Sequence, residues 1–327
     1  MTSSSVRRAA AGFTVAALAV MGLVGCGSGS DTAAKGDKPL RTVAHAMGAT
    51  KIFTEPKRIV ALDQSFVDAA LSLDGDVVGY TTYRSVNEKL PDYLGEAAKT
   101  HGKEATSVGT LAEPSLEKIA ALKPDLILSA KVRHEALYGK LAQIAPTVFS
   151  ETTGALWKDN LRLVGKALGK EQLADQRLKE YEARAQKIGA EIKEKGGKLP
   201  TVSVARFTDE PTVRLYTANS YSGIILSDIG FPRPKGQPTS EEIAVDLSEE
   251  RIADLDADHI FVATYKDEKN TSAQVQSKFE ANPLWDRLKG HKHEVDDLTW
   301  MTAVGLQGAH EVLDDLAKIF EVNPATA

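Results

Sequence analysis

Cysteine is nearly absent from this 327-residue chain, whose single copy is Cys26. A lone cysteine cannot form an intramolecular disulfide, which excludes a disulfide-stabilised scaffold. Aromatic residues make up only 6% of the sequence, so the placement of each one is informative. After residue 25 no apolar run approaches the ~18 residues of a membrane-spanning helix, so the rest of the chain is not expected to cross a bilayer.

An excess of basic residues is missing as well. Without Arg7 and Arg8 of the N-terminal segment, 38 Lys and Arg face 45 Asp and Glu, which gives a net charge of about −7. Nucleic-acid binding needs a basic face, so no nucleic-acid partner is expected. The sequence also lacks the GxSxG, HExxH, Walker and dinucleotide-binding glycine motifs. An exported enzyme therefore ranks as the lowest alternative, and we expect no enzyme activity.

The first 25 residues have the form of a secretory signal peptide. Arg7 and Arg8 precede an apolar stretch, AAAGFTVAALAVMGLVG, that is too short to span a bilayer comfortably. It ends in Leu-Val-Gly-Cys, which resembles a bacterial lipobox. That resemblance implies cleavage before Cys26, a lipid on its thiol and a place on the extracytoplasmic face of the bacterial cell membrane. The alternative for a lone cysteine is a small buried hydrophobe.

The remaining sequence alternates between strand-like and helix-like patterns. Short apolar runs such as KRIVALDQ and VVGYTT predict buried strands, and their alternation with helical spacing favours parallel α/β sheets. Residues 171–195 predict a long helix of roughly 37 Å. Because roughly 285 folded residues exceed one core, we expect two α/β lobes joined by this rigid helix. The expected parts are a signal peptide (1–25), a lipid-anchored flexible tether (26–40), an N-terminal lobe (41–154), connecting helices (155–198) and a C-terminal lobe (199–327).

Local patterns also predict details of the C-terminal lobe. TVSVARF (201–207) has an alternating pattern and predicts a strand. DEKNTSAQ predicts a loop, and SKFEANPLWDRL, which follows it, predicts a helix.

Two segments separated by 133 positions repeat one another. SLEKIAALKPDLIL (115–128) and SEERIADLDADHIF (248–261) each predict a short helix, a turn and a strand. The serine that opens each segment is placed as an N-cap, and Glu117 or Glu250 falls in the first helical turn. A carboxylate there is stabilised by the helix N-terminus by ~0.3–1 kcal/mol, which is a purely structural role. That role does not explain why both halves carry the same glutamate.

PSLEKIAALKPDLIL looks like the signature of the substrate-binding proteins of ABC importers that have a rigid interdomain helix, and within them of the iron–siderophore binders. The resemblance covers nearly all of the chain after the signal peptide, including PKRIVALDQSFVDAALSL, VGYTTY, LAQIAPTV, SVARF and DLTWMTAVG. One departure is SLDGDVVGY, where relatives usually have Leu-Gly. The resemblance implies a class III periplasmic-binding-protein fold and a monomer that passes a ferric siderophore to a permease dimer. Glu117 and Glu250 match the glutamates that pair with arginines on the two permease subunits.

The resemblance also implies ligand-binding residues. Arg206 in the apolar strand SVARF and Arg133 just after a first-lobe strand match arginines that donate hydrogen bonds to the oxygens around iron. Aromatic residues outside the predicted core runs are candidates for packing against the ligand, with core or interface packing as the alternative for each; they are Tyr83, Trp157, Tyr216, Tyr221 and Trp300. Iron arrives already coordinated by the siderophore, so the protein needs no metal ligand and no cofactor.

Several ligands stay open at this stage. SVARF, RLYT and DIGFPRP look like the hydroxamate-binding subgroup, so a ferrioxamine-like trihydroxamate is the first expectation. A mixed citrate-hydroxamate or a catecholate is the alternative siderophore, and cobalamin or haem is the alternative outside the siderophores. Direct metal binding has only His291 and His293 on one face of a predicted strand, and the sequence places no third or fourth ligand.

Overall fold

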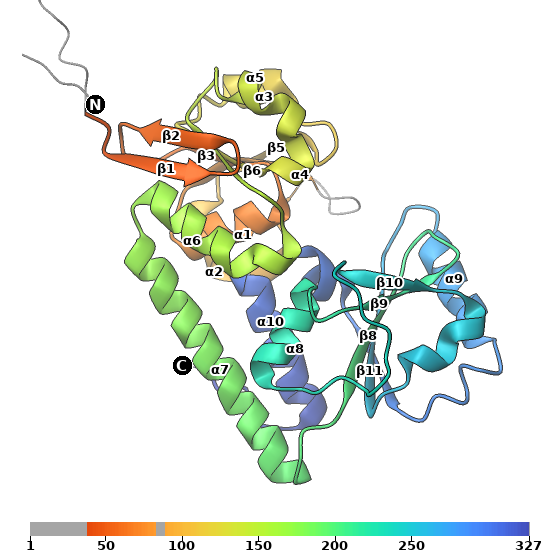
Figure 1. Cartoon of the computed structure of the whole chain (residues 1–327). Helices are drawn as coiled ribbons and strands as arrows, with labels where there is room; N and C mark the ends of the chain where they lie inside the picture. The colour runs from red at the N-terminus through yellow and green to blue at the C-terminus, as the bar shows by residue number, and fades with distance from the viewer. Residues whose placement is uncertain (1–37, 83–88, 327) are drawn as a thin grey trace, which may run out of the picture. The chain divides into compact units, whose positions relative to one another are not determined.

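The structure, a computed structural model, describes residues 38–82 and 89–326 (Figure 1). The predicted signal peptide, Cys26, most of the predicted tether and Tyr83 lie outside the described residues. Within the described ranges, no helix combines the length and the apolar character that crossing a membrane requires.

The N-terminal lobe is built on five parallel strands in the order β5-β4-β3-β6-β7. Their bounds are β3 Ile59–Ala61, β4 Val77–Thr82, β5 Thr106–Thr110, β6 Leu126–Ala130 and β7 Thr147–Ser150. Side chains alternate between the two faces of a strand. Ile59 and Ala61 join one hydrophobic cluster and Val60 joins another. Both faces of the sheet are therefore covered, as in other parallel sheets.

Short helices and an N-terminal hairpin surround this sheet. The helices are α1 Gln64–Ser72, α2 Gly95–His101, α3 Leu116–Ala121, α4 Lys131–His134 and α5 Tyr138–Leu141, and the antiparallel hairpin is formed by β1 Arg41–His45 and β2 Gly48–Ile52. Single 3₁₀ turns, η1 Asp92–Leu94 and η2 Glu135–Leu137, lie between some of them. The sequence from about residue 134, which predicts one helix, therefore forms short pieces on both sides of η2.

Two helices connect the lobes. After the turn η3 (Gly154–Leu156), α6 spans Trp157–Leu168 and α7 spans Glu171–Gly196, close to the long helix predicted for 171–195. Gly169, with a φ of 69°, allows the chain to reverse between them. Helix α7 packs on α6, α8 and α10 (Figure 1).

The C-terminal lobe has a mixed sheet in the order β10-β9-β8-β11-β12. Its strands are β8 Val202–Phe207, β9 Val213–Tyr216, β10 Ala244–Leu247, β11 His259–Thr264 and β12 His291–Val295, and its α-helices are α8 Tyr221–Ile229, α9 Thr271–Glu280 and α10 Leu306–Phe320. Strands β8, β11 and β12 are parallel, whereas β9 and β10 run antiparallel to their neighbours. The strand predicted for 201–207 is confirmed as β8. All of its residues are buried, because this strand lies inside the sheet with both faces covered.

One local prediction in this lobe is wrong, and a second holds with a different type of helix. Helix α9 begins at Thr271, inside the predicted loop, because the Asp267 carboxylate accepts hydrogen bonds from the backbone N–H groups of Thr271 and Ser272 at 2.9 and 2.8 Å. The second repeated segment forms a 3₁₀ helix, η4 Glu249–Leu255, rather than an α-helix like α3. Ser115 caps α3 through its hydroxyl, whereas Ser248 makes no such bond.

The main hydrophobic cluster runs through both lobes. It contains Phe66 of the first lobe, Trp157 and Tyr181 of the connecting helices, and Ile225 and Leu313 of the second lobe. The lobes are therefore joined by shared packing as well as by α7. The expectation of an α/β protein with two sheet-containing lobes and a long connecting helix is confirmed.

Candidate functional site

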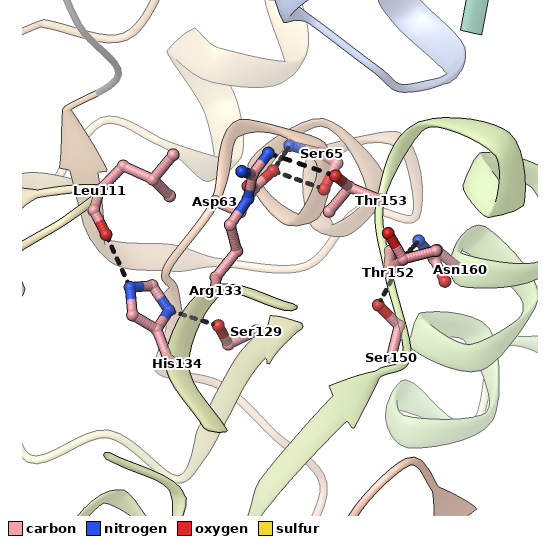
Figure 2. Close-up of polar contacts among 10 residues, drawn as sticks. All are labelled: Asp63, Ser65, Leu111, Ser129, Arg133, His134, Ser150, Thr152, Thr153 and Asn160. Atoms are coloured by element: carbon pink, nitrogen blue, oxygen red, sulfur yellow. Dashed lines mark hydrogen bonds and ion pairs between the residues drawn. The ribbon is translucent and has the colours of Figure 1, made fainter. Parts of the chain in front are cut away.

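Arg133 and Asp63 form an ion pair at the carboxyl edge of the first sheet (Figure 2). Asp63 follows β3 and Arg133 lies in α4, directly after the neighbouring strand β6. Arg133 Nε donates to Asp63 Oδ2 at 2.9 Å, and Arg133 Nη2 donates to Thr153 Oγ1 at 3.3 Å. The other Asp63 oxygen caps α1 by accepting from the Ser65 backbone N–H at 2.9 Å. Open α/β sheets bind ligands at this edge.

His134 holds the short helix that carries Arg133. Its Nε2 lies 2.7 Å from the Leu111 carbonyl oxygen and its Nδ1 lies 2.7 Å from Ser129 Oγ (Figure 2). Because a carbonyl only accepts, Nε2 carries the proton and Nδ1 accepts from the serine hydroxyl. Burial lowers the pKa of His134, which keeps the imidazole neutral. This bonding fixes the C-terminal end of the helix that carries Arg133.

The loop opposite Arg133 is fixed by its own hydrogen bonds. The Thr152 carbonyl accepts from Ser150 Oγ at 2.9 Å and from Asn160 Nδ2 at 2.8 Å (Figure 2). Thr153, the residue that contacts Arg133, therefore follows a backbone position tied both to β7 and to α6.

The second lobe repeats the arginine–aspartate arrangement. Arg206 is the penultimate residue of β8, and Asp297 follows β12. Arg206 Nε and Nη2 donate to the two Asp297 oxygens at 2.5 and 2.8 Å, and Nη1 donates to Tyr216 Oη at 3.0 Å. Burial alone would lower the pKa of Arg206, but Tyr216 and Asp297 together raise it above its ordinary value. The structure thus brings two predicted ligand residues, Arg206 and Tyr216, into contact.

Trp157 and Tyr221, predicted as ligand contacts, pack together between the lobes. The Trp157 ring meets Tyr181 at 5.2 Å and Tyr221 at 5.9 Å, both edge-on. Trp157 is 2% exposed and Tyr221 is 4% exposed, and Tyr221 Oη donates to the Gly305 carbonyl at 2.7 Å. In this conformation both side chains serve the interlobe core, and their contact with a ligand stays a prediction.

Trp300 is also enclosed by protein. It lies in the π-helical turn η5 (Leu298–Thr302), where its ring is tilted against that of Phe261 with the centroids 4.8 Å apart and its Nε1 donates to Asp315 Oδ2 at 2.8 Å. Its exposed fraction is 0%, so a ligand role, which stays a prediction, would require this turn to open.

Sequence reasoning missed the buried carboxylate of Asp68, which joins the lobes. Asp68 lies on α1, and its oxygens accept from the backbone N–H groups of Gln307 at 3.0 Å and Gly308 at 3.1 Å, in the first turn of α10. Burial raises the pKa of Asp68 to about 6, and these hydrogen bonds act in the opposite direction. A β-carbon at Gly305 would overlap the Asp68 side chain, so the close approach requires glycine. The signal in the sequence was an acidic residue inside the apolar helix FVDAALSL.

Asp63 and Asp297 were missed too, although each is an acidic residue just after a buried strand. That position, at the carboxyl edge of a parallel sheet, was the available signal.

Glu117 and Glu250 both lie exposed in the first turn of a short helix. Glu249, next to Glu250, forms an ion pair with Lys278 and so serves the lobe itself. The structure places both glutamates where another protein can reach them, and their permease role stays a prediction.

The structure adds His259 to the histidine pair considered as a metal site. His259 Nδ1 lies 2.9 Å from His293 Nε2, and the His259 and His291 rings are 5.3 Å apart. Even so, no group of three or more His, Cys, Asp or Glu side chains in residues 38–82 and 89–326 is arranged to hold a metal ion.

Known proteins resemble the chain over most of its length. A family model described as "Periplasmic binding protein" matches residues 59–294. The chain is 37% identical over 318 residues to the probable siderophore-binding lipoprotein YfiY of Bacillus subtilis, covering 93% of this chain and 95% of that protein. It is 29% identical to the Fe(3+) dicitrate-binding periplasmic protein FecB of Escherichia coli, covering 88% and 95% of the two chains.

A solved structure with the same architecture is Staphylococcus aureus SirA complexed with staphyloferrin B. The TM-score is 0.78 at 33% identity, and the match covers 87% of this chain and 99% of SirA. The family model spans well over half of the chain, and YfiY matches nearly all of it. The chain therefore belongs to the periplasmic binding protein family.

Proposed function

We propose that this protein is the extracytoplasmic substrate-binding component of an ABC importer, which captures a ferric siderophore and delivers it to the membrane permease. The observation that carries the proposal is nearly full-length similarity to proteins named as siderophore binders. Each lobe also carries an arginine at the carboxyl edge of its sheet, Arg133 and Arg206, where two lobes can hold a ligand between them. The family and these relatives bind substrates, and we propose that this chain likewise has no enzyme activity.

Membrane attachment follows from the N-terminal sequence. We propose that Cys26 carries the lipid, that the tether up to residue 40 lets the lobes move near the membrane, and that the protein acts as a monomer. YfiY, which matches 93% of this chain, is named a lipoprotein. The experiment is metabolic labelling with a radioactive fatty acid, which Cys26→Ser should abolish.

Permease docking is assigned to Glu117 and Glu250. Two exposed carboxylates, one on each lobe, can engage two basic pockets of a permease dimer at once, and each contact raises the effective concentration of the other. Charged residues at the edge of a protein–protein interface raise the association rate more than they raise the affinity.

The proposal also names the class of siderophore that the protein binds. A ferrioxamine-like trihydroxamate is the first candidate from the sequence, with a mixed citrate-hydroxamate, a catecholate and, outside siderophores, cobalamin or haem as alternatives. FecB is named for ferric dicitrate and the SirA structure contains staphyloferrin B, so ferric dicitrate belongs among the ligands to be tried.

Intrinsic tryptophan fluorescence provides the test. The described part of the chain holds Trp157, Trp285 and Trp300, all buried, whose emission bound iron complexes quench. The protein is titrated with ferrioxamine, ferrichrome, a ferric tricatecholate, ferric dicitrate, cobalamin and haem. Saturable quenching by at least one ferric siderophore is the expected result. Saturation by cobalamin or haem alone would replace the siderophore function with the alternative one.

A further inference from the structure

Both arginines proposed for the ligand site are already paired with aspartates. Arg133 bonds Asp63 at 2.9 Å, and Arg206 bonds both oxygens of Asp297 at 2.5 and 2.8 Å. The two carboxylates are among the least exposed in the protein, at 3% for Asp63 and 6% for Asp297. Water therefore screens them poorly, and their charge acts on whatever lies beside the arginines.

Other basic residues next to these two arginines are paired as well. Lys131, two residues before Arg133, lies 3.1 Å from Glu151, and Arg214, across the sheet from Arg206, lies 2.7 Å from Glu210. Neither of these two neighbours therefore adds an uncompensated positive charge beside Arg133 or Arg206.

A paired arginine keeps part of its donor capacity. Of the five N–H bonds of Arg206, two are used by Asp297 and one by Tyr216. Two N–H bonds of this guanidinium are therefore not used by Asp297 or Tyr216, and the adjacent carboxylate cancels most of its attraction for a distant negative charge. Such a site recognises polarised oxygens and selects against a high negative charge.

We propose that Asp63 and Asp297 determine the charge preference of the siderophore site. They are positioning residues that hold Arg133 and Arg206 and neutralise them, so that this protein prefers ferric complexes of low net charge. Three singly charged hydroxamates balance a ferric ion, whereas three doubly charged catecholates leave a trianion, and ferric dicitrate is also an anion. The preferred substrate class is accordingly the ferric trihydroxamate. This inference rests on the proposed siderophore function.

The experiment compares ligands of different charge on charge-removing variants. Affinities for ferrichrome, which is neutral, and for ferric enterobactin, a trianionic tricatecholate, are measured by fluorescence quenching on wild type, Asp63→Asn and Asp297→Asn. At about 10 Å and an effective dielectric constant of about 20, removing one negative charge should favour a ligand by about tenfold for each negative charge that it carries. The ratio of the affinities for the trianion and for neutral ferrichrome should therefore move by at least about tenfold in each variant.

Matched variants separate this effect from general damage. Asp175→Asn removes the same charge from an exposed ion pair with Arg162 on the connecting helices and should leave the ratio unchanged. Asp63→Glu retains the charge and should retain the wild-type ratio. Asparagine at position 63 can still cap α1, so this variant is expected to fold and carries the test by itself if Asp297→Asn does not fold.

Each outcome bears on a separate statement. If wild type binds ferric enterobactin or ferric dicitrate as tightly as ferrichrome, the charge preference is wrong, but the siderophore function is unaffected. An unchanged ratio in Asp63→Asn overturns the role of the aspartates. Failure of every ferric siderophore to bind overturns the proposed function itself.

Discussion

Replacing Asp68 by asparagine removes a buried charge at the point where α1 of the first lobe meets the N-terminus of α10 in the second. The Asp68 pKa is raised from 3.8 to about 6 in the folded protein. A carboxyl group whose pKa rises on folding stabilises the fold most at low pH, and that contribution is lost as the pH increases through the folded pKa. A rise from 3.8 to about 6 corresponds to roughly 3 kcal/mol, most of it lost between pH 4 and pH 7.

Asparagine does not titrate, so the variant should not show this loss. Relative to wild type, the free energy of unfolding of Asp68→Asn should rise by roughly 2.4 kcal/mol from pH 4 to pH 7. Two histidines change the stability in the opposite direction over the same pH range. Burial lowers the pKa values of His259 and His310 to about 4, so each contributes less to the free energy of unfolding as the pH falls. Both histidines are present in both proteins, and their contributions cancel in the difference.

The assay is urea unfolding at half-unit intervals from pH 4 to pH 7.5, followed by circular dichroism. The slope of free energy against urea must agree between the two proteins for the comparison to hold. Parallel stability curves, with a difference constant within about 0.5 kcal/mol, would show that Asp68 is not desolvated as its burial implies. The reasoning about the interlobe contact would then fail.

Three further predictions concern the proposed permease contact and the packing between the lobes. Glu117→Gln combined with Glu250→Gln should abolish import while ligand quenching is retained; lost quenching would mean that the glutamates serve the ligand instead. Tyr221→Phe removes the hydrogen bond to the Gly305 carbonyl and should cost about 1 kcal/mol in urea unfolding. Trp157→Ala should cost about 3–5 kcal/mol because it empties the packed space beside Tyr181, and a loss under 1 kcal/mol would contradict the packing described.

Periodic patterns were sufficient to predict the architecture. The regular spacing of apolar residues such as Leu178, Ala185 and Ile192 predicted α7, and short apolar runs predicted the strands. Both patterns are visible because the buried positions of a helix or a strand recur at a fixed spacing in the sequence. The structure of the second repeated segment could not be read this way. Its residues match those of α3 closely, yet it forms a 3₁₀ helix, since a missing cap hydrogen bond at Ser248 is a matter of geometry rather than composition.

Of the two arginine–aspartate pairs at the sheet edges, only the arginines were predicted from the sequence. Arg133 and Arg206 were predicted from the resemblance to iron–siderophore binders, and for Arg206 also because a guanidinium inside an apolar strand needs a partner or a ligand. Their partners Asp63 and Asp297 lie 70 and 91 residues away in sequence, and no local pattern connects them. The burial of Trp157 and Trp300 was equally hidden, because an aromatic residue at a chain exit can pack in the core or face a ligand with the same sequence around it.

The contact between Asp68 and α10 also bears on the order in which the chain can fold. Asp68 and the backbone N–H groups that satisfy it are separated by 239 and 240 residues, so the contact closes one of the longest loops in the chain. Loops of this length close late and slowly. Until α10 has left the ribosome, α1 holds a carboxylate that cannot be buried without its partner, and the two lobes cannot seal. Sealing of the two lobes therefore has to wait until nearly the whole chain is available.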